Sequence, residues 1–446
     1  MTSLLTHKTK KLLAIVATVA LASYAQLAQA TPKIQHWQNE HGSKVYFVAA
    51  PELPMIDIRI TFDAGSARDH DIPGLALMTN GLLAEGTSKL DADAIAESFE
   101  NVGANFDNSV DRDSATISLR SLTDEKWFEP ALETFITVLS DPSFSETVLE
   151  RERQRALIAL RGQKQSPQSI IGNAFYKNLY AGHAYAAPTL GYEKSIKAMT
   201  RANIQLFYQR HYVASNATIA IVGDLDHKEA VALANRLTAK LGKEEKLSRI
   251  DAVNYSSAKK RVHIEHPSTQ THIMVGMPSH ARGDKDHFAL FLGNHILGGS
   301  GFGSHITKAI REDRGLAYSA YSYIAAMRAE GPLVIGLQTS TNQTDEALQV
   351  LHDTLAAFLK NGPNEEELIA AKQDIINGFP LRIASNSSLL DYVSLIGFYG
   401  LSLDYLDDFT DKIDKVSKED VRNAFAKRIK LDQLLTVTVG QSNPEQ

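Results

Sequence analysis

Alternating apolar and polar residues predict a strand near the start of the chain. In residues 55–63, isoleucines and a phenylalanine occupy every second position, and charged or hydroxyl side chains lie between them. A period of two is typical of a strand with one buried face. A polar turn follows, and the apolar stretch 75–83 then has the spacing of a helix.

The same order of elements returns in the second half of the chain. A strand pattern at residues 272–277 is followed by a polar turn and by an apolar helical stretch at residues 288–297. Later landmarks repeat as well, at nearly constant spacing. The offsets are 213 residues from Leu75 to Phe288, 219 from Leu149 to Leu368, and 217 between the β-branched strands 218–222 and 435–439. Such a long repeat predicts a duplicated domain rather than a solenoid.

The order of strands and helices is not strictly alternating, so we expect an α+β fold. Each of the two similar domains is predicted to be a mainly antiparallel sheet packed with helices, facing the other across a cavity. A polar, weakly patterned stretch at residues 241–260 predicts the linker. The expected domains are therefore residues 31–245 and 246–446.

Residues 1–30 have the features of a secretory signal peptide. Lysines at positions 8, 10 and 11 precede a short apolar run, and Ala28-Gln29-Ala30 forms a cleavage site. The alternative, an uncleaved membrane anchor, is disfavoured because the run is too short to span a bilayer comfortably. We therefore expect a periplasmic protein with no membrane span after cleavage.

Composition narrows the possible functions of the exported chain. Removing the three lysines changes the formal net charge from −6 to −9, which argues against a nucleic-acid partner. The sequence has no cysteine, so it forms neither disulfides nor thiolate metal sites. Its 446 residues, 43% of them hydrophobic, suffice for two large cores.

Motifs for the common hydrolytic chemistries are absent from the sequence. Neither HExxH nor HxxEH occurs, and no GxSxG pentapeptide marks a serine nucleophile. His36 and His41 are five residues apart, which is the wrong spacing for two ligands on one helix. Histidines 280 and 287, beside acidic turn residues, are expected to be ordinary turn residues rather than a metal site. The glycine-rich run 298–303 lacks the lysine of a phosphate-binding loop, so its glycines are expected to allow close approach of backbone or of an extended substrate.

The segment 304–323 carries the most informative pattern. Residues 304–314 have helical spacing, Gly315 is placed to end the helix, and a strand pattern follows. Arg311 then falls in the last helical turn and Tyr318 at the start of the strand, close enough to converge. From the pattern alone, a surface ion pair for Arg311 and a sheet position for Tyr318 are the simpler interpretation.

This segment resembles the second-domain signature of the pitrilysin/insulinase metallopeptidases, and the resemblance extends over essentially the whole mature chain. In that family an Arg and a Tyr seven residues apart reach substrate bound at the zinc of the first domain. Arg311 and Tyr318 have this spacing. The matching residues are Asn-His-Ile-Leu-Gly-Gly at 294–299, Ser304, Ile-Arg-Glu at 310–312 and Gly-Leu-Ala-Tyr at 315–318.

The chain departs from the family where the zinc would be bound. The resemblance places Leu77 and Gly81 at the two histidine positions, Asn80 at the general-base glutamate and Ala159 at the distal glutamate ligand. Leu, Gly and Ala cannot ligate zinc, and Asn is a poor base. We therefore expect no metal on this chain.

In divided members of the family, an HxxEH-containing chain pairs with a relative that supplies the Arg and the Tyr. The resemblance thus implies a non-catalytic, substrate-binding subunit of a heteromeric zinc metalloendopeptidase. Its partners would be a paralogous subunit that carries the zinc and a peptide substrate. The alternative is a peptide-binding or scaffolding envelope protein with no role in proteolysis.

Overall fold

The computed structural model describes residues 32–243, 247–255 and 260–442. The predicted signal peptide, residues 1–30, and the predicted domain boundary at residues 245 and 246 lie outside these ranges, so both stay predictions. No helix in the described part of the chain is long and apolar enough to cross a membrane.

The first half of the chain forms a six-stranded sheet in the order β1-β2-β6-β3-β5-β4. Neighbouring strands are antiparallel except for β2 and β6, which are parallel. The strands are β1 (Gln35–Gln38), β2 (Lys44–Ala49), β3 (Met55–Phe62), β4 (Asn105–Val110), β5 (Ala115–Leu122) and β6 (Ala217–Gly223).

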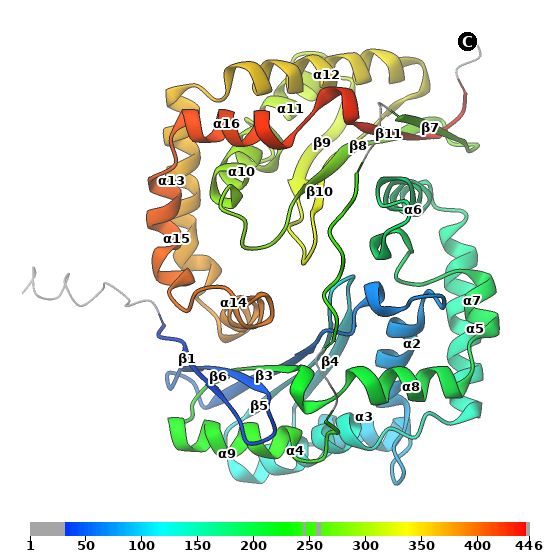
Figure 1. The fold of residues 1–446 in the computed structure, drawn as a ribbon, viewed down its shortest axis with the longest axis vertical. Coiled ribbons are helices and arrows are strands. Elements are labelled where there is room, and N and C mark those ends of the chain that lie inside the picture. The colour runs from blue at the N-terminus through cyan, green and yellow to red at the C-terminus, as the bar shows by residue number, and fades with distance from the viewer. Residues whose placement is uncertain (1–31, 244–246, 256–259, 443–446) are drawn as a thin grey trace, which may run out of the picture. The chain divides into compact units, whose positions relative to one another are not determined.

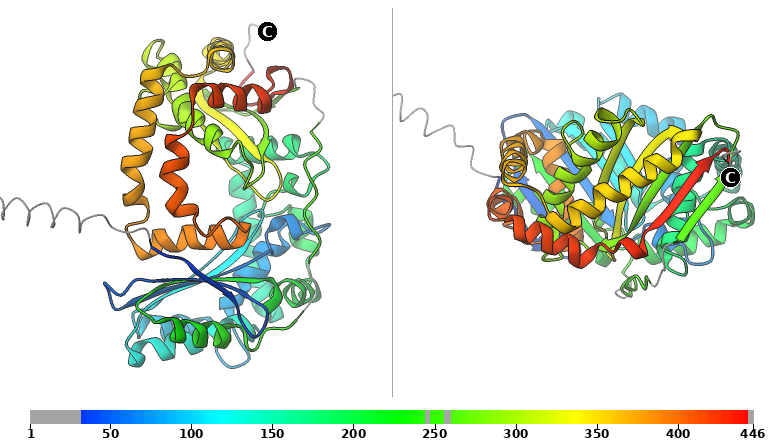
Figure 2. Two further views of the ribbon diagram at one scale, coloured as in Figure 1. Left: turned by 60° about the vertical axis from the view of Figure 1, so that its left-hand side comes forward. Right: turned by 90° about the horizontal axis from the view of Figure 1, so that it is seen from above.

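The second half forms a five-stranded sheet in the order β7-β11-β8-β10-β9. In this sheet β11 and β7 form the parallel pair, and the other neighbouring strands are antiparallel. Strands β7 and β11 are visible side by side in Figure 2, right. The strands are β7 (Lys260–Glu265), β8 (Gln270–His280), β9 (Ala317–Ile324), β10 (Gly331–Ser340) and β11 (Leu435–Gly440).

The two sheets have the same topology once β1 is set aside. In both, a parallel pair is followed by three antiparallel strands, so β2, β6, β3, β5 and β4 correspond to β7, β11, β8, β10 and β9. The predicted α+β fold with two similar mainly antiparallel sheets is therefore confirmed. The alternating pattern of residues 55–63 correctly predicts strand β3, because every second side chain, mainly isoleucine, is buried in the core.

Helices surround both sheets (Figure 1). Those of the first half are α2 (Leu75–Gly81), α3 (Ala92–Glu100), α4 (Glu125–Ser140), α5 (Glu146–Gln163), α6 (Pro167–Leu179), α7 (Glu193–Ala198), α8 (Arg201–His211) and α9 (His227–Thr238). Those of the second half are α10 (His287–Asn294), α11 (His305–Thr307), α12 (Thr344–Asn361), α13 (Glu365–Arg382), α14 (Asn386–Tyr399), α15 (Tyr405–Asp414) and α16 (Lys418–Arg428).

Each half contributes one helix to the sheet of the other half. Helix α6 packs on β8 and β11 of the second sheet, whereas α14 packs on β3 and β6 of the first (Figure 1). Phe175 of α6 is fully buried in a cluster with Val334 and Val437. Gly397 allows α14 to approach its sheet, because a Cβ there would lie 2.6 Å from the Tyr46 ring. The reciprocal exchange joins residues Ile34–Gln446 into one compact unit.

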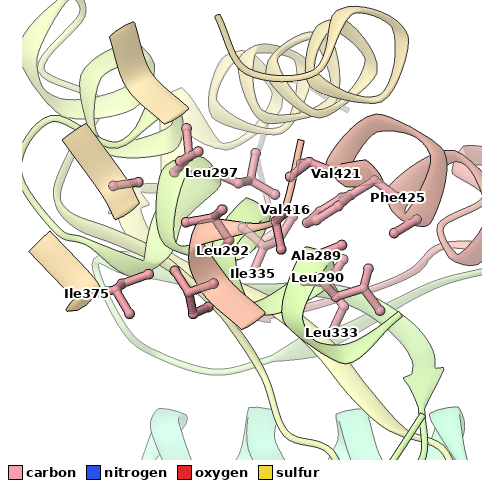
Figure 3. Close-up of a cluster of buried hydrophobic side chains, with 14 of the residues drawn as sticks. Ala289, Leu290, Leu292, Leu297, Leu333, Ile335, Ile375, Val416, Val421 and Phe425 are labelled. Atoms are coloured by element: carbon pink, nitrogen blue, oxygen red, sulfur yellow. The ribbon is translucent and has the colours of Figure 1, made fainter. Parts of the chain in front are cut away.

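The largest core cluster holds the second half together. Leu290 and Leu292 of α10 are buried against Leu333 and Ile335 of β10, with Phe425 of α16 beside them (Figure 3). Burying each of these side chains contributes roughly 1.5–3 kcal/mol of transfer free energy. This core fixes α10 and the segment after it against the sheet, and the segment that carries Arg311 packs on the same layer.

A buried carboxylate links the two halves. Asp113, in the turn between β4 and β5, is 2% exposed. It accepts hydrogen bonds from the hydroxyl of Tyr185 at 2.5 Å, the hydroxyl of Tyr399 at 2.9 Å and the backbone N–H of Arg328 at 2.7 Å. Tyr399 ends α14 and Arg328 lies between β9 and β10, so one side chain of the first half is bonded to two segments of the second.

Candidate functional site

The structure brings Arg311 and Tyr318 together. The expected α-helix over residues 304–314 is a single α-helical turn, α11, followed by a π-helical segment at Lys308–Glu312. Gly315 ends it with φ 63°, and its N–H bonds the carbonyl of Arg311 at 3.0 Å. The wider π turn is often found at functional sites. The chain then enters β9, whose second residue is Tyr318.

The guanidinium of Arg311 lies between two aromatic rings. Its central carbon is 4.6 Å from the ring centroid of Phe302 and 4.6 Å from that of Tyr318. Tyr318 is 83% exposed and Phe302 71%, so both rings are open to a ligand. Cation–π contacts at exposed sites contribute about 0.5–1 kcal/mol each. The stack therefore orients the guanidinium without covering its donors.

The simpler interpretation of Arg311, a surface ion pair, is not what the structure shows. Among residues 32–243, 247–255 and 260–442, no carboxylate lies within ion-pair distance of its guanidinium. Its neighbour Lys308 bonds Asp313 at 2.7 Å instead. With respect to the described residues, Arg311 thus keeps its five donors free for a carbonyl or carboxylate ligand, for which its planar fork is suited.

A β-bulge sets the direction of Tyr318. The pairing of β9 with β10 shifts between Leu337 and Thr339, which lie opposite Ala320 and Ala317. The extra residue on β9 leaves both Tyr318 and Ser319 exposed, where simple alternation would bury one of them. Bulges are often found beside functional sites because they re-aim a side chain.

The glycine-rich run serves close backbone packing. A Cβ on Gly298 would lie 2.5 Å from the Ser322 hydroxyl and 2.8 Å from its nitrogen. Asn294 bonds the same serine, donating to its carbonyl at 3.2 Å and accepting from its hydroxyl at 2.8 Å. Of the two expected roles for these glycines, the approach of backbone to backbone is the one that Gly298 fulfils. The run then continues to Phe302, which completes the stack on Arg311.

The residues that the resemblance assigns to the family's zinc site lie on two helices. Leu77, Asn80 and Gly81 share the short helix α2, and Ala159 lies exposed on α5. Leu77 is half-buried and Gly81 exposed. No group of three or more His, Cys, Asp or Glu in the described residues could hold a metal ion. Leu, Gly and Ala offer no donor atom to zinc and an Asn amide is a poor base, so these four residues do not fit a catalytic zinc ion.

Asn80 has a structural role of its own. Its side-chain amide donates to the hydroxyl of Tyr212 at 3.1 Å and to the carbonyl of Thr116 at 3.3 Å. The backbone carbonyl of Asn80 accepts a hydrogen bond from the side-chain amide of Asn108 at 2.8 Å. Tyr212 is fully buried, and burial raises the pKa of its phenol. The amide of Asn80 therefore joins α2 to the sheet and to Tyr212 at the end of α8. A glutamate at this position would instead bury its carboxylate beside a neutral phenol.

The start of α2 is fixed by a buried acid. Asp69 accepts the backbone N–H groups of Gly74 and Ala76, both at 2.7 Å. Burial raises the pKa of Asp69 to about 7, against the opposing effect of the two donors. The side chain caps the start of α2, and it lies deep in the protein, being 3% exposed.

Two features of the site were not found from the sequence. Phe302 was treated only as part of a glycine-rich run, and the bulge that exposes Ser319 beside Tyr318 has no signal in a pattern of period two. The sequence signal for Phe302 is its position between Gly301 and Gly303, where a large ring is flanked by residues that have no side chain.

Comparison with known proteins places the chain in a family. The description "Insulinase (Peptidase family M16)" matches residues 44–193, and "Peptidase M16 inactive domain" matches residues 198–375. A crystal structure described as a peptidase M16 inactive domain from Pseudomonas fluorescens is 39% identical, with a TM-score of 0.89 over 92% of this chain and 98% of that one. The chain belongs to the peptidase M16 (insulinase) family.

More distant relatives share the fold and much of the length. A protease from Helicobacter pylori superposes with a TM-score of 0.84 at 19% identity, over 92% of this chain and all of that one. A Bacillus subtilis protein named the uncharacterized zinc protease YmxG is 23% identical over 80% of this chain and 86% of its own length. A Mycobacterium leprae protein, also named a zinc protease, is 26% identical over 87% of each chain. That the family's zinc motif is lost at Leu77, Asn80 and Gly81 stays a prediction from the resemblance.

Proposed function

We propose that this M16 chain is the non-catalytic, substrate-binding subunit of a heteromeric zinc metalloendopeptidase. It supplies Arg311 and Tyr318 to an HxxEH site on a paralogous partner. The observation that carries the proposal is the Arg311 guanidinium, held between two exposed rings with no carboxylate partner in the described residues. A scaffold protein would not need an arginine whose guanidinium is oriented by two aromatic rings and left open to a ligand.

The chemistry of the two side chains fits peptide binding. The guanidinium donates to the carbonyl oxygens of an extended peptide through a planar pair of N–H groups. The Tyr318 hydroxyl donates to the oxygen on which negative charge develops when a carbonyl is attacked, which is an electrostatic contribution to catalysis. The partner subunit supplies the zinc and the activated water, since Leu77, Asn80, Gly81 and Ala159 cannot.

The location of this function is also a proposal. The signal-peptide pattern of residues 1–30 supports export to the periplasm, where a zinc-bearing partner would have to be exported as well.

The proposal is tested by isolating the chain with whatever accompanies it. A tagged mature chain is purified from its native periplasm and assayed on a quenched fluorescent peptide, with and without a zinc chelator. We expect a co-purifying HxxEH-containing chain and cleavage that the chelator abolishes. Arg311→Ala and Tyr318→Phe should each lower kcat/KM by about 100-fold, the usual effect of removing one donor to a developing oxyanion.

Matched variants separate a site effect from a general one. Arg314→Ala removes an exposed arginine three residues away, whose one hydrogen bond to the described residues goes to the carbonyl of Ala309. Tyr192→Phe removes the hydroxyl of another exposed tyrosine. Both should cleave like the wild type. A chain that purifies alone and cleaves nothing would instead leave the peptide-binding scaffold as the better account.

A further inference from the structure

A second arginine lies near the end of β9 that is farther from Tyr318. Arg112 belongs to the turn between β4 and β5 of the first half, and its central guanidinium carbon is 3.6 Å from the ring centroid of Tyr176 on α6. Tyr176 also forms a hydrogen bond with Tyr323, the seventh residue of β9. Because α6 packs on the second sheet, it brings Arg112 of the first half to the strand that carries Tyr318.

Arg112 forms no ion pair with any residue that the structure describes. Other arginines of the first half do form such pairs: Arg59, Arg68 and Arg120 each bond a carboxylate at 2.5 to 2.7 Å. The Nε of Arg112 donates to the backbone carbonyl of Tyr185 at 3.1 Å. Its two terminal nitrogens make no hydrogen bond within the described ranges, so they are available to a ligand.

The two acids that flank Arg112 are used inside the turn and at the junction of the halves. Asp111 accepts the backbone N–H groups of Asp113 at 2.7 Å and of Ser114 at 2.6 Å. Asp113 accepts the three hydrogen bonds that link the two halves. Neither carboxylate therefore serves as the ion-pair partner of Arg112.

An unpaired guanidinium in this place is unfavourable by itself. Arg112 is half-buried, and burial lowers its pKa because the charged form loses hydration. A charge that is withdrawn from water is costly unless a partner of opposite sign compensates it. Stacking on the Tyr176 ring offsets only part of this cost. An anionic ligand that reaches the two terminal nitrogens would provide the remaining compensation.

Strand β9 sets the distance between Arg112 and the Arg311 site. Tyr318 and Tyr323 are five residues apart on this strand, which is about 17 Å at roughly 3.4 Å per residue. The rings of Tyr321 and Tyr323 stack with their centroids 6.2 Å apart, and both are partly exposed along the strand. An extended peptide that starts at Tyr318 and follows β9 would reach Arg112 after about five residues.

We propose that Arg112 binds a carboxylate of the peptide whose backbone is held at Arg311 and Tyr318. Two groups supply this chemistry, the C-terminal carboxylate and the side chain of an Asp or Glu, and the planar pair of guanidinium N–H groups fits either. The inference rests on the proposed function in taking an extended peptide as the ligand. It adds a substrate class, namely peptides that carry a negative charge about five residues from the backbone at Tyr318.

Peptide binding to the purified mature chain alone tests the inference. The probes are nonapeptides of alternating alanine and serine that carry fluorescein at the N-terminus. One pair differs only in ending with a free carboxylate or an amide. The other pair ends with an amide and has Glu or Gln at the central position. Fluorescence anisotropy should show a carboxylate peptide binding about tenfold more tightly than its neutral counterpart, as expected for a charge-assisted bidentate pair. The pair that shows the difference identifies the source of the carboxylate.

Arg112→Gln should remove this preference and leave the binding of the neutral peptides unchanged. Arg261→Gln is the matched control, because Arg261 is exposed on β7, at the opposite edge of the sheet from β9. A measurement on the wild type covers the case in which Arg112→Gln does not fold. Modification of Arg112 by phenylglyoxal, followed by mass spectrometry, should slow about tenfold at a saturating concentration of the carboxylate peptide, whereas Arg261 should react at an unchanged rate.

Arg311→Ala separates this inference from the proposed function. It should weaken all four peptides by a similar factor and leave the preference for the carboxylate. A preference that is lost in Arg112→Gln, together with no effect of Arg311→Ala, would support the Arg112 site and contradict the role of Arg311. Equal binding of carboxylate and neutral peptides by the wild type would overturn the Arg112 site. A preference that survives in Arg112→Gln, or an Arg112 that the bound peptide does not protect, would overturn it as well.

Discussion

Removing the Asp113 carboxylate should loosen the two halves from each other. Three donors converge on this side chain, from Tyr185, Tyr399 and the N–H of Arg328. In Asp113→Ala each donor loses a charged acceptor inside the protein. A buried polar group left unsatisfied costs about 1–3 kcal/mol, and water entering the space recovers part of this. We expect the free energy of unfolding to fall by about 4 kcal/mol.

The assay is urea unfolding of the mature chain, followed by circular dichroism and by hydrogen exchange of the native state. Tyr399→Phe removes one of the three bonds and should cost about 1 kcal/mol. Tyr392→Phe, on the same helix, removes a hydroxyl that makes no hydrogen bond to the described residues and should cost less than about 0.5 kcal/mol. Exchange should increase in α14 and in the segment around Arg328, while the interior of each sheet stays protected.

An unfolding free energy of Asp113→Ala within about 1 kcal/mol of the wild type would contradict this role of Asp113, since a carboxylate joining the halves cannot be lost at so small a cost. An equal increase of exchange throughout the chain would contradict it as well. That result would show a general loss of stability rather than a loosened contact between the halves.

Two further predictions concern stability. His211 is buried, and burial, with Arg68 and Arg210 nearby, lowers its pKa to about 4. A histidine with a lowered pKa contributes stability above the ordinary pKa of about 6.5, and this contribution is lost as the pH falls toward 4. Between pH 8 and pH 5 the unfolding free energy of the wild type should therefore fall by about 2 kcal/mol more than that of His211→Gln in urea titrations. Equal losses in the two proteins would contradict this. Gly298→Ala should lower the unfolding free energy by about 2 kcal/mol, because the added Cβ meets the backbone of β9. Gly378→Ala, in open space on α13, should be neutral or stabilising. Similar melting temperatures for the two variants would show that Gly298 is not needed for the close approach.

The duplication and most elements could be predicted from the sequence. Strand β3 alternates apolar with polar residues, and helices such as α4 have a single apolar side, so their periods reveal them. The structure buries both faces of β3 and of β8, because α14 packs on β3 and α6 packs on β8. The exchange of α6 and α14 could not be predicted. Periodicity shows that one side of a helix is buried, but it does not show which sheet buries it.

The site was only partly predictable for a related reason. The sequence shows the spacing of Arg311 and Tyr318, but the contact between their side chains depends on the π-helical turn and the β-bulge. Both shift the register by one residue and leave no trace in hydrophobic periodicity. The contact of Arg112 with Tyr176 of α6, near the end of β9, likewise joins residues that are far apart in the chain.

In the proposed function, this chain supplies Arg311 and Tyr318 to a zinc site on another subunit. The most direct measurement is reconstitution. The purified partner that carries HxxEH is titrated with the mature chain, and peptide cleavage is followed at constant zinc. We predict that peptide cleavage rises to a maximum at one chain per partner. With Arg311→Ala in place of the wild-type chain, cleavage should reach no more than about 1% of the wild-type level. Full activity of the partner alone, or equal restoration by Arg311→Ala and the wild type, would contradict the account.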